Sequence, residues 1–91
     1  MDSKIRNLFS SGKLDEAIAE IKDVLIPFHK TMKQVYADDS EHFLFYFGSL
    51  AGDYGNLLQI LLRKNDIEEA MAVSNTIDEI IADATKLLPK L

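Results

Sequence analysis

Three long stretches of the chain place apolar residues at alternating steps of four and three, and this spacing limits the possible folds more than any other feature. Such steps return to one face of an α-helix, so each stretch predicts a helix that packs lengthwise on others. The stretches span residues 14–37, 40–64 and 66–88, and a shorter helical stretch covers residues 3–10. The positions that follow this spacing are Leu14, Ile18, Ile21, Leu25, Phe28, Met32 and Val35 in the first, Phe43, Phe47, Leu50, Tyr54, Leu57 and Leu61 in the second, and Ile67, Met71, Ser74, Ile77, Ile81, Ala84, Leu88 and Leu91 in the third.

The polar breaks between these stretches carry residues that typically start and end helices. Gly12 follows the short stretch, Asp39 and Ser40 begin the second long one, and Asp66 precedes Glu69 with the spacing of a capping box. Connections of a few residues make neighbouring long helices run antiparallel. We therefore predict an all-α fold, an antiparallel bundle of three long helices plus a short N-terminal helix, with residues 1–91 as one domain.

Pro27 lies inside the first long stretch, where a proline removes one backbone hydrogen bond and bends or breaks a helix. The apolar spacing continues across it, from Leu25 through Phe28 to Met32. The sequence therefore predicts one long helix, kinked at Pro27, rather than two separate helices.

The stretch HFLFYFGSLAGDYGN, residues 42–56, combines five large apolar residues in a row with three glycines. Glycine inside a helix costs about 1 kcal/mol relative to alanine, so three of them suggest that something approaches this side of the helix closely. Three occupants remain open: a neighbouring helix of the same chain, a partner helix or second copy of the protein, and a ligand. Phe45 and Ile60 are expected to point away from the packing face. The candidate interface residues are Leu44, Phe45, Gly48, Gly52, Gly55 and Leu62.

Asp53 is the one charged residue between Phe43 and Leu62, a length that reaches across a bilayer. A carboxylate in the middle of a membrane-spanning helix costs several kcal/mol. We therefore expect no membrane insertion, and we expect this helix to be the central and most buried one of the bundle.

The chain has few residues of the types that catalyse reactions or bind metals. The chain has two histidines, His29 and His42, and no cysteine. No Glu-x-x-His pair occurs on two helices as a di-iron bundle requires, and no serine has a histidine placed to activate it. We expect no enzyme, no metal and no cofactor. A small-ligand or metal-binding bundle that uses His29, His42 and nearby carboxylates remains an alternative.

The charge balance limits the classes of partner. A net charge of -5 disfavours general binding to nucleic acid, which relies on basic residues. The first residues lack the apolar core of a signal peptide, and the absence of cysteine fits a reducing compartment, so we expect a cytoplasmic protein without a nucleic-acid partner.

Residues 48–55, GSLAGDYG, followed by Leu57-Leu58 and by NDIEEA at residues 65–70, resemble the latter half of a histidine phosphotransfer domain, itself a helical bundle. The resemblance covers about half of the chain. At the positions of that family's phosphorylated histidine and of its lysine, this chain has Leu44 and Phe47. The resemblance therefore implies a helical bundle that docks with a partner but is not itself phosphorylated.

These observations favour a noncatalytic interaction or regulatory bundle that binds a protein partner or forms a homodimer. A signalling adaptor similar to phosphotransfer bundles, without the phosphate-accepting histidine, is the alternative from the resemblance.

Overall fold

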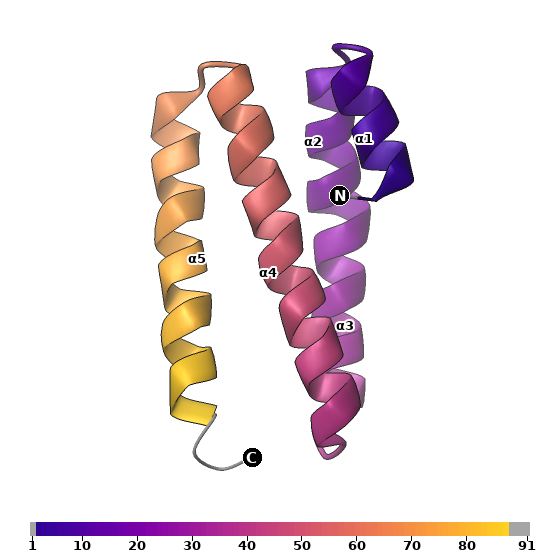
Figure 1. Ribbon diagram of the computed structural model, residues 1–91, viewed down its shortest axis with the longest axis vertical. Helices are drawn as coiled ribbons and strands as arrows, with labels where there is room; N and C mark the ends of the chain where they lie inside the picture. Colours follow the sequence, from indigo (N-terminus) through magenta and orange to yellow (C-terminus); the bar gives the residue numbers. More distant parts are fainter. Residues whose placement is uncertain (1, 88–91) are drawn as a thin grey trace.

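The computed structural model of the protein describes residues 2–87, and helices are the only regular elements in that range (Figure 1). The first long helix, which we call the α2–α3 helix, is continuous: α2, a π-helical turn η1 and α3 follow one another without a loop. The all-α prediction is confirmed. The bounds of the elements are α1 Ser3–Ser10, α2 Leu14–Glu20, η1 Ile21–Leu25, α3 Ile26–Val35, α4 Ser40–Arg63 and α5 Ile67–Leu87.

Local capping contacts explain where the last two helices begin. The side chain of Asp39 accepts a hydrogen bond from the backbone N–H of His42 at 3.3 Å, and Asp66 accepts one from the N–H of Glu69 at 3.3 Å. These carboxylates satisfy amides that have no partner inside the helix. Between α4 and α5, Asn65 has a φ of 65°, the left-handed conformation that asparagine tolerates at a helix end.

α4 is the central helix of the fold, between α5 on one side and the α2–α3 helix on the other (Figure 1). It runs antiparallel to both of them, and α1 turns back at Gly12 to pack on α2. Gly12 has a φ of 74°, which a residue with a Cβ adopts only under strain. The Cα atoms span 41 × 24 × 16 Å, so the molecule is long and thin.

One apolar core forms around α4, which supplies more buried residues than any other helix. In this core α1 and the α2–α3 helix pack on one side of α4, and α5 packs on the other. The expectation that α4 is the most buried helix is therefore confirmed. The buried apolar residues are Ile5, Ala17, Ile21, Ile26, Leu50, Leu57, Ile60, Leu61, Ala70 and Val73.

The π turn changes which face of the α2–α3 helix enters the core. The N–H of Ile26 donates to the carbonyl of Ile21, five residues back instead of four, so this turn holds one extra residue. The inward positions then continue as Ile26 and His29, whereas Phe28 and Val35 are 51% and 65% exposed. The expectation that Phe28 and Val35 continue the packing face is wrong, because alternating steps of four and three assume a regular α-helix throughout.

Pro27 follows this π turn directly and lies in the first turn of α3. A proline ring crowds the carbonyl four residues earlier in a regular helix, and a wider turn relieves that contact. The chain passes through this region as helix, as the phase of the apolar residues suggested. A kink at Pro27 stays a prediction.

Ile60 is fully buried, although it was expected to point away from the packing face together with Phe45. α4 packs against helices on two sides, so its buried arc is wider than a single row of residues. Phe45 lies outside this arc and is 65% exposed, as expected.

α5 has two apolar faces and packs with only one of them. Ala70 and Val73 are buried against α4, whereas Ile67, Met71 and Ile81 are 50%, 64% and 56% exposed. The predicted packing face of this helix is therefore wrong at three positions, because the sequence offers two rows with similar spacing. Two further predicted positions lie outside the described residues, Leu88 and Leu91.

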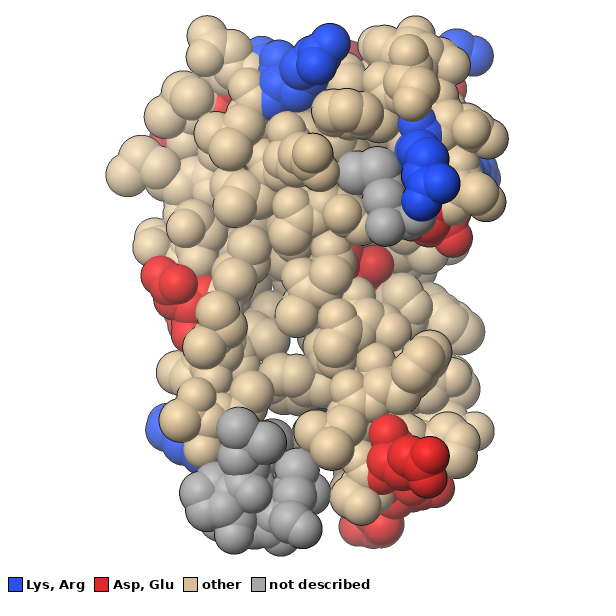
Figure 2. All heavy atoms as spheres, viewed as in Figure 1, with Lys and Arg blue, Asp and Glu red and all other residues tan. Residues whose placement is uncertain are grey.

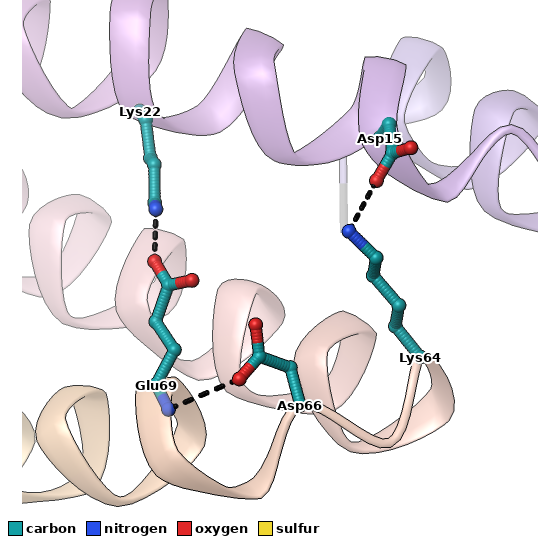
Figure 3. A network of polar contacts seen from close by, with 5 residues as sticks. All are labelled: Asp15, Lys22, Lys64, Asp66 and Glu69. Atoms are coloured by element: carbon teal, nitrogen blue, oxygen red, sulfur yellow. Dashed lines mark hydrogen bonds and ion pairs between the residues drawn. The ribbon is translucent and has the colours of Figure 1, made fainter.

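Ion pairs link the α2–α3 helix to the turn between α4 and α5 and to the start of α5 (Figure 3). Lys64 Nζ lies 2.6 Å from Asp15 Oδ1, and Lys22 pairs with Glu69, whose backbone N–H is capped by Asp66. The Asp15 carboxylate raises the pKa of Lys64. Water screens exposed ion pairs of this kind, so they orient the helices more than they stabilise the fold.

Candidate functional site: the exposed face of α4

The predicted interface residues lie on the side of α4 that faces solvent, and we call them the exposed face of α4. Leu44, Phe45 and Leu62 are 44%, 65% and 53% exposed. The core residues of the same helix point to the opposite side. The exposed face consists of Leu44, Phe45, Gly48, Gly52, Gly55 and Leu62.

The three glycines of this face border open space. A Cβ atom added to Gly48, Gly52 or Gly55 meets no atom within 4 Å, so no described helix of the same chain packs closely on them. The first of the three predicted occupants, a neighbouring helix of the same chain, is therefore wrong for the described residues. The open space also means that the cost of about 1 kcal/mol per glycine is not offset by a close contact with the other described helices.

The exposed face of α4 carries no charge. Asp53 is the only charged residue between Phe43 and Leu62, and it is buried, with 6% of its surface exposed. Figure 2 shows that residues without charge form most of the surface over α4 and α5, while charged side chains gather toward the ends and edges of this view. Twenty residues correspond to about five turns of helix, so the uncharged surface is long.

The apolar surface continues from α4 onto α5. A hollow of about 260 Å³ opens between these helices, close to the turn that joins them. Several of its apolar walls are largely exposed, notably Leu62, Ile67 and Met71. Contiguous exposed apolar surface on a small protein commonly marks an interaction site. The residues that line the hollow are Leu58, Leu62, Ile67, Ala70, Met71 and Ser74.

On the other side of α4, Asp53 makes a buried contact with His29 of α3. The Nδ1 atom of His29 and the Oδ2 atom of Asp53 are hydrogen-bonded, and the two side chains are 17% and 8% exposed. Burial raises the pKa of the Asp53 carboxyl, the hydrogen bond to His29 opposes this shift, and the charge of Asp2 adds to it. Each side chain satisfies the other, so the pair is a polar clasp between α3 and α4.

Aromatic rings gather where α3 leads into α4. Tyr36 stacks on His42 and on Tyr46, with ring centroids 4.7 and 5.7 Å apart. His42 Nδ1 lies 2.8 Å from Asp39 Oδ2, and this hydrogen bond lowers the pKa of Asp39. The rings fix the turn before α4 through stacking. A hollow of about 350 Å³ beside them is lined by Glu41, His42, Phe45 and Tyr46.

Both histidines and Lys33 are engaged within the chain. His29 bonds Asp53, His42 bonds Asp39, and the Nζ atom of Lys33 lies 5.3 Å from the ring centre of Phe47. Within residues 2–87 no group of three or more His, Cys, Asp or Glu side chains is arranged to hold a metal ion. The metal-binding alternative thus has no ligand set in this range.

The sequence reasoning missed the clasp between His29 and Asp53. A signal was present, since Asp53 is the lone carboxylate in a long uncharged stretch and His29 lies on a neighbouring antiparallel helix. The π turn hid the relationship, because it rotates His29 inward relative to the regular helix that the spacing implied.

None of the described helices is long and apolar enough to cross a membrane. No protein-family model matches the chain, and no curated protein or solved structure matches it either.

Proposed function

We propose that this protein is a noncatalytic interaction module that self-associates through the exposed face of α4. The observation that carries the proposal is a long, uncharged helix face with three glycines that border open space. Its cysteine-free composition suits a cytoplasmic setting.

The physical reason to expect self-association through this face is its lack of charge. The protein carries a net charge of -5, so the total charges of two copies repel each other. The exposed face of α4 has no charge to add to this repulsion, and Leu44, Phe45 and Leu62 offer apolar area that water would otherwise cover. Glycines let two helix backbones come closer than larger residues would, which increases the contact between them.

The proposal is tested by measuring molar mass with light scattering behind a sizing column, over a wide range of protein concentration. We expect a dimer whose population rises with concentration. A mass equal to that of one chain at every concentration would contradict self-association.

Gly52→Leu tests the face itself. A Cβ atom at this exposed position meets no atom within 4 Å and the substitution removes a helix glycine, so we expect the isolated fold to gain up to about 1 kcal/mol. The bulk of the leucine separates two approaching backbones, so dimerisation should weaken by about tenfold or more. Ala19→Leu, on an exposed position of α2, is the matched control and should leave association unchanged. A dimer that is as stable in Gly52→Leu as in the wild type would place the contact elsewhere.

A further inference from the structure

The outward side of α4 has a centre and two oppositely charged ends. Glu41 is the acidic residue of its first turn and Arg63 the basic residue of its last turn, and both are exposed. Each lies eleven residues from Gly52. Residues spaced by four and three share one side of a helix, which we call the outer row of α4. The outer row consists of Glu41, Phe45, Gly48, Gly52, Gln59 and Arg63.

We propose that a second copy of the chain packs antiparallel along this outer row, with a twofold axis at Gly52. The inference rests on the self-association proposed above and specifies its geometry. In an antiparallel pair centred on Gly52, Glu41 lies opposite Arg63 of the partner subunit, and Phe45 lies opposite the partner's Gln59. Gly52 meets Gly52 of the partner subunit at the crossing point.

Charge complementarity favours a second copy of the chain as the partner of the outer row, with its α4 antiparallel to the first. Figure 2 shows acidic side chains gathered at the N-terminal end of α4 and basic ones at its C-terminal end. The acidic end contains Asp38, Asp39 and Glu41. At the other end Arg63 is the basic residue of the last turn of α4, whereas Lys64 is already paired with Asp15 and the acidic residues Asp66, Glu68 and Glu69 belong to the start of α5. An antiparallel pair brings opposite ends together twice, whereas a parallel pair would bring like charges together. An isologous contact of this kind requires a self-complementary surface, and the outer row is one.

The contacts around the ends are compatible with this pairing. The guanidinium carbon of Arg63 lies 5.7 Å from the ring centre of Phe9 in the same chain. Stacking over a ring leaves the in-plane N–H donors of arginine available to a carboxylate. Antiparallel helices that cross at about 20° stay close along their length, and the ends lie about 16 Å from the crossing point, so the long Glu and Arg side chains remain within reach.

Single cysteines give a direct test, because the chain has none of its own. Gly52→Cys places two thiols at the proposed axis, and we expect rapid formation of a disulfide dimer under mild oxidation. Gln59→Cys is the matched control for direction. In the antiparallel pair its two copies lie about 21 Å apart along the helices, far beyond the roughly 7 Å Cα separation that a disulfide allows. In a parallel pair they would touch.

Charge reversal provides an independent test of the ends. Glu41→Arg or Arg63→Glu alone creates two like-charge contacts per dimer, so we expect dimerisation to weaken by about tenfold at low salt. The double variant restores opposite charges and should return to within about threefold of the wild type. Glu16→Arg and Lys30→Glu change the net charge equally on other helices and serve as controls.

The outcomes separate this inference from the proposed function. Crosslinking of Gly52→Cys without crosslinking of Gln59→Cys, together with rescue in the double reversal, supports the antiparallel pair. Crosslinking of Gln59→Cys, failure of Gly52→Cys to crosslink, or single reversals that match their controls would each overturn it, even where light scattering shows a dimer and self-association stands. A single-chain mass at all concentrations would instead remove the self-association on which the inference rests.

Discussion

His29 on α3 and Asp53 on α4 form a hydrogen-bonded pair between the two helices, and this pair is the main buried polar contact of the described fold. It lies behind the exposed face of α4, on the side of the helix that packs against α3. The carboxylate in the middle of the long uncharged stretch of α4 thus links two helices.

Removing one partner of the pair should destabilise the fold. We expect His29→Ala to lower the free energy of unfolding by about 2–3 kcal/mol, because it leaves a buried carboxylate without a hydrogen-bond donor. Replacing both residues by leucine should cost less than about 1 kcal/mol, since two apolar side chains leave no polar group unsatisfied. Urea denaturation of both variants measures the difference. Equal losses in the single and double variants would contradict a coupled pair.

The stability of the wild type relative to Asp53→Asn should depend on pH. Burial raises the pKa of Asp53 above the value of 3.8 expected for the unfolded chain. The unfolded chain therefore releases this proton first as the pH rises, so the folded state loses stability between the two pKa values. We expect Asp53→Asn to gain on the wild type as the pH increases above about 4 and to keep that gain beyond the raised pKa.

Denaturation of both proteins from about pH 3 to about pH 7 tests this expectation. Asp39, whose pKa is lowered by His42, acts with the opposite sign, but it is present in both proteins and cancels in the difference. A gain that shrinks as the pH rises would show that pairing with His29 outweighs burial.

Pro27→Ala should change stability very little. A proline in the middle of a regular helix costs about 3 kcal/mol relative to alanine, so its removal would normally stabilise the protein by that amount. Here the π turn at Ile21–Leu25 precedes the proline, and we expect a gain below about 1 kcal/mol. Thermal and urea denaturation measure it, and a gain close to the full amount would mean that the π turn does not accommodate the ring.

Ile60→Ala and Phe45→Ala should differ sharply, although both residues are large and lie on the same helix. Ile60 is fully buried, so we expect a loss of about 3 kcal/mol from the missing contacts and the cavity. Phe45 is 65% exposed, so its replacement should change the unfolding free energy of the single chain by less than about 0.5 kcal/mol. Denaturation at concentrations where the protein is monomeric gives both values. Similar losses would contradict the burial of Ile60.

Much of the fold could be predicted because its determinants are local. Asp39 and Asp66 cap helices through contacts within three residues, and the apolar spacing marks each helix without reference to its neighbours. The short connections then require antiparallel neighbours. The helices, their order and the central place of α4 were therefore determined by the sequence alone.

Tertiary packing decided which faces are used. The hydrophobic effect is not directional, so the sequence of α5 does not show whether the row with Met71 or the row with Val73 is buried. Contact with α4 buries the row with Val73 and leaves Met71 exposed. The extra residue of the π turn rotated His29 toward Asp53, a change that regular periodicity does not contain. The glycines of α4 were visible in the sequence as a feature to be explained, but that they border open space follows only from where the neighbouring helices lie.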